Sequence, residues 1–262
     1  MDPAALLAPI AETDPAILAA LAGVMLVGGF VKGAVGFALP MIAVSGIGSI
    51  LEAQETVALL ILPTFLSNVW QSMRQGLAAA GGTARRFWRL NLVLVLVIGL
   101  VAQAVPHLPS AALFAALGAT VTAAAAIQLA GWRPRAPVAP GGRRALELGA
   151  GVIGGIMGGL AGVWGPAVVL FLVALGTEKT EQIRAQGLSF LLGSVVLVAA
   201  HLQSGILNAQ TLPLSAALCL PVMAGMALGL KAQDRMAQAT FRRITLVVLC
   251  LAGLNLLRRA LF

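Results

Sequence analysis

GGFVKGAVGFALP, from Gly28 to Pro40, is the stretch that decides the fold, because it recurs as GGIMGGLAGVWGP from Gly154 to Pro166. The two copies align without a gap at an offset of 126 residues. From residue 28 to residue 55 the alignment holds seven identities, which indicate a gene duplication: Gly28/Gly154, Gly29/Gly155, Gly33/Gly159, Gly36/Gly162, Pro40/Pro166, Glu52/Glu178 and Glu55/Glu181. Glycine and proline in the middle of long apolar segments are typical of a transporter's binding site.

The composition indicates an integral membrane protein. Of the 262 residues, 60% are hydrophobic and 10% are charged, whereas a soluble domain carries about 25% charged residues. The long uncharged runs favour membrane-spanning helices over a barrel. The net charge of +8 comes from short basic clusters between apolar runs, which is the positive-inside pattern of a membrane protein. We therefore expect membrane lipid as a partner and no nucleic acid.

Eight apolar segments follow one another along the chain. They cover residues 17–50, 57–73, 90–105, 111–130, 146–175, 183–202, 211–230 and 244–257. Six have the length of a single span, but the first and fifth are too long for one straight span of about 20 residues and short for two. We predict that each of these two segments forms a hairpin of two half-length helices that meet inside the membrane.

The basic residues distinguish this hairpin model from eight single spans. They form clusters at Arg74/Arg85/Arg86/Arg89, Arg133/Arg135/Arg143/Arg144, Lys179/Arg184, Lys231/Arg235/Arg242/Arg243 and Arg258/Arg259. Eight single spans would put ten of these residues on one side of the membrane and six on the other. Two hairpins would put fourteen on one side and two on the other, a much stronger bias. The charge count therefore favours the hairpins, with the linker 133–145 cytoplasmic and the N-terminus periplasmic.

The predicted fold class is an all-α polytopic membrane protein with two inverted repeats. Residues 1–132 form the first repeat and residues 146–262 the second, and each has a broken or re-entrant helical hairpin plus three transmembrane helices. An odd number of crossings per repeat turns the second repeat upside down relative to the first, as in many secondary transporters. This arrangement would bring the two hairpin tips together near the middle of the membrane.

The duplicated stretch predicts a binding site for a small anion. A proline suits the first position of a helix, so we expect unwound turns over Gly33–Leu39 and Gly159–Gly165, each followed by a half-helix. Unpaired N–H groups at a helix N-terminus attract anions, and glycine lets a ligand approach the backbone closely. The predicted site residues in the two stretches are Gly33, Gly36, Phe37, Pro40, Met41, Gly159, Gly162, Trp164, Gly165, Pro166 and Ala167. The alternative is that Gly29-x-x-x-Gly33 and Gly155-x-x-x-Gly159 pack helices together.

Several polar side chains complete the predicted substrate site. Lys32 is the only Lys or Arg deep inside an apolar segment, and it either neutralises an anionic substrate or reaches toward an interface. Trp164 either donates its indole N–H to the anion or packs. The polar residues of the spans after the hairpins either face the site or bond helices together: Asn68, Gln71, Gln186 and Ser189. The repeated glutamate pairs precede helices, where acidic residues favour the positive end of the dipole.

The duplicated stretch also resembles a known family. KGAVGFALP at 32–40 and GGLAGVWGPAVVLF at 158–171 resemble the sulfite exporter TauE/SafE family, and the resemblance covers essentially the whole chain. It implies a bacterial inner-membrane carrier for sulfite, sulfonates or related small organosulfur anions. One departure is that Leu39 stands where the second copy has Gly165, so we expect two non-equivalent half-sites.

The sequence as a whole predicts a secondary carrier that moves a small anion by alternating access. We expect no enzymatic activity, no cofactor and no metal. The chain has no nucleotide-binding motif, so we do not expect a primary pump. A non-transporting membrane scaffold or assembly factor is one alternative. An intramembrane hydrolase is another, with His201 and either Ser45 or Ser49 as the one conceivable pairing. The substrate, the transport direction, the coupling ion and a homodimeric state stay open.

Overall fold

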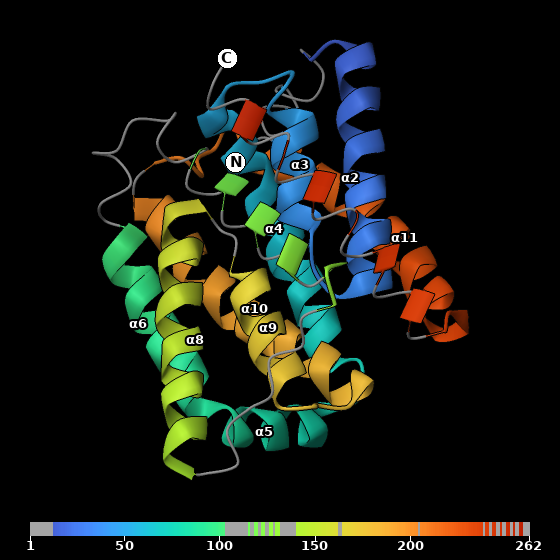
Figure 1. Ribbon diagram of the computed structural model, residues 1–262. Helices are drawn as coiled ribbons and strands as arrows, with labels where there is room; N and C mark the ends of the chain where they lie inside the picture. The colour runs from blue at the N-terminus through green and yellow to red at the C-terminus, as the bar shows by residue number, and fades with distance from the viewer. Residues whose placement is uncertain are drawn as a thin grey trace. The chain divides into compact units, whose positions relative to one another are not determined.

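The computed structural model describes residues 13–102, 140–161, 164–203 and 205–237, with scattered positions in 115–131 and 239–258. Every regular element in these parts is a helix, which confirms the predicted all-α class (Figure 1). The helices are α2 (Pro15–Val35), α3 (Leu39–Ile47), α4 (Ala53–Met73), α5 (Leu77–Arg86), α6 (Trp88–Ala102), α8 (Pro140–Ala161), α9 (Gly165–Ala174), α10 (Lys179–Gln203) and α11 (Leu212–Arg235).

The long apolar helices identify a multi-pass membrane protein. Within the described residues, four helices are long and apolar enough to cross a membrane: Pro15–Val35, Glu55–Met73, Thr180–Ala199 and Leu212–Arg235. The apolar helix Trp88–Val101 is shorter. These helices match predicted segments, whereas most of the predicted span 111–130 and much of 244–257 lie outside the described residues.

The first apolar segment turns back on itself. A methyl group added at Gly28 would touch Leu39, and one added at Gly46 would touch Val24, so α3 runs antiparallel to α2. The two arms are not the half-length helices that we expected. Helix α2 has 21 residues, about 31 Å at 1.5 Å per residue, whereas α3 has nine.

The second apolar segment has the same construction. Helix α8 has 22 residues and α9 has ten, and glycine contacts place Gly154 beside Ala167 and Gly158 beside Trp164. Helices α2 and α8 end at residues 35 and 161, and helices α3 and α9 begin at residues 39 and 165, so both boundaries obey the 126-residue offset of the repeat. The predicted unwound turns were too long, because Gly33 and Gly159 remain inside helices.

The helices form two compact units, and each unit combines elements from both halves of the sequence. Unit 1 comprises residues 1–67 and 197–236, and unit 2 comprises residues 68–196 and 237–262. In unit 1 the hairpin helix α2 packs along α11, and in unit 2 the hairpin helix α8 packs along α6. Adding the 126-residue offset to the bounds of α6 (88–102) gives residues 214–228, which lie within α11. Each hairpin therefore packs on the equivalent helix from the other half of the chain.

In unit 1, glycines from both helices let α2 and α11 approach to backbone contact. A methyl group at Gly29 would lie 2.2 Å from the Val222 carbonyl oxygen, and one at Gly225 would lie 2.0 Å from that of Leu26. Gly33 and Gly229 repeat these contacts one turn further along. The two glycines of Gly29-x-x-x-Gly33 therefore pack α2 against α11, as the packing alternative predicted. Helix α11 contributes a second glycine pair, Gly225 and Gly229, which was not predicted.

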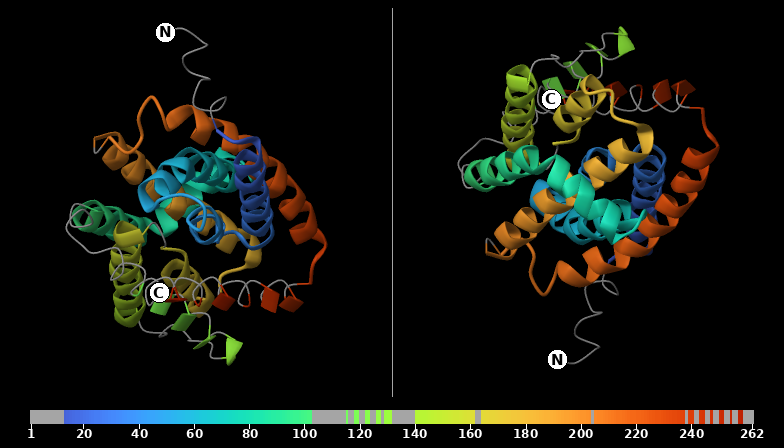
Figure 2. Two further views of the ribbon diagram at one scale, coloured as in Figure 1. Left: turned by 90° about the horizontal axis from the view of Figure 1, so that it is seen from above. Right: turned by 90° about the horizontal axis from the view of Figure 1, so that it is seen from below.

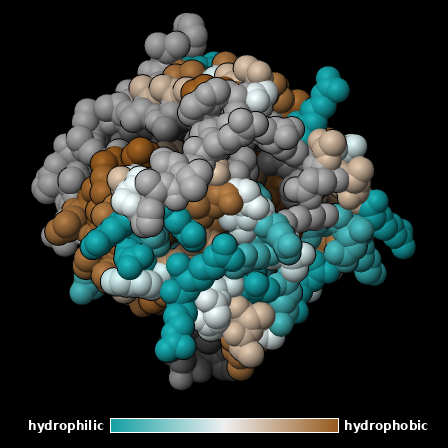
Figure 3. Space-filling model, turned by 60° about the horizontal axis from the view of Figure 1, so that its bottom comes forward, coloured by the Kyte–Doolittle hydropathy of each residue, from teal (hydrophilic) through white to brown (hydrophobic). Residues whose placement is uncertain are grey.

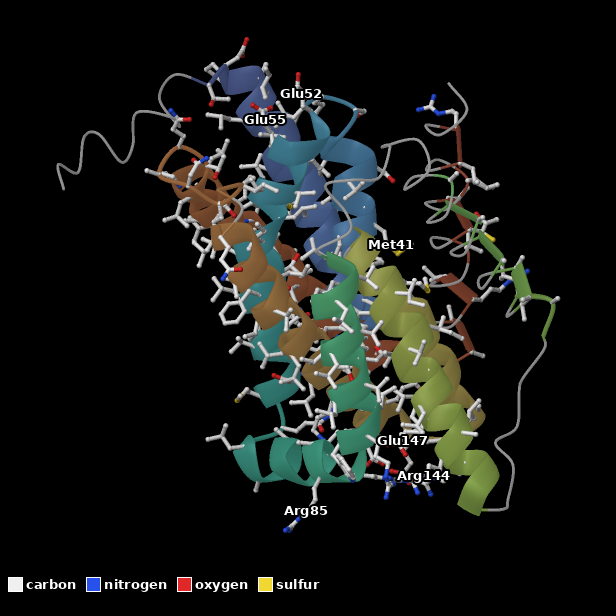
Figure 4. All side chains as sticks on the ribbon, turned by 90° about the vertical axis from the view of Figure 1, so that its left-hand side faces the viewer. Met41, Glu52, Glu55, Arg85, Arg144 and Glu147 are labelled. Atoms are coloured by element: carbon white, nitrogen blue, oxygen red, sulfur yellow. The ribbon has the colours of Figure 1, made fainter. Side chains whose placement is uncertain are left out.

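In unit 2, valines of α6 fill the glycine positions of α8. Added methyl groups at Gly151, Gly155 and Gly159 would meet the β-carbons of Val93, Val97 and Val101, respectively, within 2.9 Å. Both series rise by four residues, so α6 and α8 are parallel, and they lie side by side in Figures 1 and 4. The repeated glycines thus set the spacing of the helix pair in both units.

Helix α5 was not predicted. It is Ala-, Gly- and Arg-rich rather than apolar, and it lies across the end of α6 from which that helix starts (Figure 1). Its buried face includes Ala80 and Thr83, and it ends at Arg85 and Arg86. Figure 3, in which the lower side of Figure 1 comes forward, shows many hydrophilic residues on this side.

Candidate functional site

The break in the first hairpin is a short strained turn in unit 1. Gly36 ends α2 with a φ of 85°, and its N–H donates to the Lys32 carbonyl oxygen over 2.7 Å. Ala38 has a φ of 84°, a left-handed conformation that is uncommon for residues other than glycine. A strained residue of this kind is retained where the surrounding structure fixes it, often at functional sites.

Helix α3 begins directly after this turn without a side-chain cap. Ala38 occupies the capping position and makes no side-chain hydrogen bond, while Pro40 lies in the first turn as predicted. A helix start of this kind carries a partial positive charge and N–H donors that can bind an anion. Phe37 and Met41 flank the helix start and are buried.

Lys32 lies one helical turn before the break and is almost completely buried. Its side chain is 2% exposed, so it does not extend to the molecular surface as the snorkelling alternative requires. A buried ammonium group is costly unless other groups compensate its charge. Lys32 thus lies buried beside the break, and its role in binding an anion stays a prediction.

The second break, in unit 2, holds a packed tryptophan. Trp164 is 3% exposed, and its ring meets Phe190 edge-on with 6.0 Å between ring centroids. Methyl groups added at Gly158 or Gly193 would collide with the indole. The side chain therefore packs between α8 and α10, as the more ordinary of the two alternatives predicted.

The other predicted residues at the second break are only partly described. Gly165 and Ala167 are buried in the first turn of α9. Gly162 and the side chain of Pro166 lie outside the described part of the chain. Binding of the substrate at this break stays a prediction.

Buried polar side chains link α10 to α4 and α6 in unit 2. Asn68 Nδ2 donates to Ser194 Oγ over 3.4 Å, and Gln71 Nε2 donates to the Ile183 carbonyl oxygen over 3.1 Å. Ser189 Oγ donates to Asn91 Oδ1 over 2.6 Å. Three of the four polar candidates therefore bond helices together. The fourth, Gln186, is 2% exposed, and its Oε1 has no hydrogen-bond partner among the described residues.

An ion pair distinguishes the hairpin model from eight single spans. Arg86 Nη1 lies 2.7 Å from Glu181 Oε2, and Arg184 bonds both Thr83 Oγ1 and Gln75 Oε1. The cluster at 179–184 thus lies at the same end of unit 2 as the cluster at 74–89. Eight single spans would separate these clusters by a full membrane thickness, so the contacts support the hairpins.

Glu147 was not singled out by the sequence. This carboxylate is 5% exposed, and Oε1 accepts the backbone N–H of Leu90, near the start of α6, over 3.3 Å. Arg89 Nη1 lies 3.8 Å from Oε2. Its signal in the sequence was a lone carboxylate at the edge of an apolar segment. The contacts assign Glu147 to anchoring α8 on the positive end of α6.

Comparison with known proteins gives one match over most of the chain. The family model described as sulfite exporter TauE/SafE matches residues 21–256. No curated protein and no solved structure shows significant similarity to the chain. The matched range begins within α2 and includes both helix breaks.

Proposed function

The chain belongs to the sulfite exporter TauE/SafE family, and on this premise we propose that it is a secondary carrier for sulfite or an organosulfonate. Membrane transport of sulfur-containing anions is what the family implies. Our proposal adds the substrate, an alternating-access mechanism and a bacterial inner membrane with the linker 133–145 on the cytoplasmic side.

The observation that carries the proposal is the pair of helix breaks at equivalent positions. Each break starts a short helix inside an otherwise apolar segment, at Leu39 and at Gly165. Non-helical backbone at membrane depth is tolerated where protein buries it or where it lines a water-filled cavity. Broken helices that aim their N-termini at anionic groups are the usual construction of a carrier's binding site.

The first break supplies the charge and the donors that a small sulfur oxyanion needs. Sulfite and sulfonate groups carry several acceptor oxygens on one sulfur atom. These oxygens can therefore accept hydrogen bonds from the backbone N–H groups in the first turn of α3. Lys32, one turn before the break, would neutralise one negative charge of the substrate. Gly36, with no β-carbon, would let the substrate approach the backbone of the turn closely.

The second break, in unit 2, offers anion-binding groups of its own in this proposal. Its helix start at Gly165 would provide N–H donors, and Trp164 would close the site on the side of α10. Gln186 would offer its amide N–H groups to the anion, whose oxygens accept hydrogen bonds. The two breaks then differ in character, with the cation at the first and neutral groups at the second.

Flux in sealed vesicles tests the proposal. We expect purified protein in proteoliposomes to move ³⁵S-labelled sulfite down its gradient, and excess unlabelled sulfonate to compete, while acetate competes weakly. Protein-free liposomes and proteoliposomes carrying Lys32→Met are the controls. A rate no higher than that of protein-free liposomes for every sulfur anion tested would favour the scaffold alternative.

A further inference from the structure

One end of unit 2 is rich in arginine side chains that are not neutralised. The two carboxylates that contact arginines there are already engaged, Glu181 with Arg86 and Glu147 with Leu90 N–H and Arg89. Arg85 and Arg144 are exposed, and neither has an ion pair within the described parts of the chain. Figure 4 shows both arginines at the same end of unit 2 as Glu147. This end therefore presents uncompensated positive charge.

An apolar strip begins at that end and continues along α6. Trp88, Leu92, Leu96 and Leu100 recur every four residues, and each is between 49% and 71% exposed. A helix carries residues at this spacing on one face. Trp88, at the start of the strip, also lies against the Arg89 guanidinium, whose central carbon is 5.1 Å from the ring centroid.

Helix α8 extends this strip sideways. Val152 and Ile156 are also exposed. On α8, each of them directly follows a glycine that contacts a valine of α6. On α6, Leu92 and Leu96 each directly precede one of these valines. Because the helices are parallel and turn 100° per residue, these positions project to the same side of the pair. We call this surface the α6/α8 face: Trp88, Leu92, Leu96, Leu100, Val152 and Ile156.

We propose that the α6/α8 face binds an anionic phospholipid, with its phosphate held by Arg85 and Arg144 and its acyl chains along the leucine strip. The charge at one end and the apolar side chains beyond it match the two parts of a lipid molecule. Trp88 lies at the boundary between the two parts, where tryptophan is enriched in membrane proteins. Arginine near a membrane surface attracts anionic headgroups. This proposal does not depend on the identity of the transported substrate.

Native mass spectrometry of the full-length protein tests the proposal. The probes are phosphatidylglycerol and phosphatidylcholine with the same acyl chains, and the variant is Arg85→Gln/Arg144→Gln. The control variant, Lys231→Gln/Arg235→Gln, removes the same charge at two exposed positions of α11. We expect wild type and control to retain phosphatidylglycerol in preference to phosphatidylcholine, and the test variant to bind phosphatidylglycerol at least about tenfold more weakly, or about 1.4 kcal/mol.

Two further measurements separate the lipid from other occupants. Inorganic phosphate alone should not displace bound phosphatidylglycerol, because it lacks acyl chains, and Leu96→Ala should weaken retention while leaving the melting temperature within a degree or two. Equal phosphatidylglycerol binding by both double variants would overturn the proposal. So would a lipid-free dimer that Leu96→Ala dissociates, because a second copy of the chain would then occupy the face.

Discussion

Asn68 and Ser194 are joined by a hydrogen bond of 3.4 Å between Nδ2 and Oγ, and they lie 126 residues apart, which is the offset of the duplication. In a two-fold arrangement, a residue that contacts its own equivalent lies at the axis. If a two-fold axis relates the two repeats, the contact between α4 and α10 at this pair lies on it. Both residues are fully or nearly fully buried, so the bond forms away from solvent.

Exchanging the two residues tests this relationship. If the pair lies on an axis, Asn68→Ser/Ser194→Asn presents the same side chains with the helices interchanged, and the bond is kept. We expect the exchanged protein to melt closer to wild type than Ser194→Ala, which removes the acceptor of a buried amide at a cost of about 1–3 kcal/mol. The measurement is the melting temperature in one detergent. A double variant less stable than Ser194→Ala would show that the two positions are not equivalent.

The glycine contacts of unit 1 predict a position-specific loss of stability. Gly33→Ala places its methyl group 2.3 Å from the Met226 carbonyl oxygen, so α2 and α11 must separate, and we expect a loss of about 1–3 kcal/mol. Gly23→Ala is the matched control in the same helix, because nothing lies within 4 Å of its added methyl group. Chemical denaturation in mixed micelles compares the two. Equal stabilities would mean that the glycines of α2 do not set its distance from α11.

The left-handed conformation of Ala38 predicts an unusual response to glycine. Ala38→Gly should leave stability unchanged or raise it by up to about 1 kcal/mol, because it removes the β-carbon that the left-handed region disfavours. Ala43→Gly, in the buried interior of α3, should instead destabilise by about 1 kcal/mol. If both variants lose stability to the same extent, the turn at residue 38 is not strained in the folded protein.

The sequence predicted the hairpins because proline and glycine interrupted long apolar runs at a fixed offset. It placed the breaks correctly but made them too long, because a glycine within a membrane helix can serve either unwinding or packing. Gly36 has a positive φ and ends its helix, whereas Gly33 packs on α11. The residue type is the same in both cases, and the neighbouring helix makes the difference.

Other features could not be read from local patterns. Helix α5 has no apolar run, so a search for hydrophobic segments passes over it. Helices α2 and α11 pack together although they lie almost 200 residues apart in the sequence. The local sequence of neither segment indicates which other segment it contacts. The sequence left open whether Asn68, Gln71 and Ser189 face the site or bond helices together, because their partners lie far away along the chain.

Basic residues from three clusters lie at the same end of unit 2, and this placement predicts a labelling pattern. Single cysteines at positions 85, 144 and 179, in a protein whose Cys219 and Cys250 are replaced, should all react with a membrane-impermeant maleimide from one side only. Right-side-out and inverted vesicles identify that side, which we expect to be cytoplasmic. Labelling of position 179 from the side opposite to positions 85 and 144 would be incompatible with the hairpins.

Substrate-induced thermal stabilisation of Lys32→Met tests the central claim most directly, namely that the first helix break and its buried lysine bind the anion. Methionine keeps most of the volume of the lysine side chain and removes its charge. Lys231→Met is the control, because Lys231 is exposed at the end of α11. With each protein titrated with sulfite at constant ionic strength, we predict that Lys32→Met binds at least tenfold more weakly, about 1.4 kcal/mol, while Lys231→Met matches wild type. Unchanged sulfite affinity in folded Lys32→Met would contradict the account.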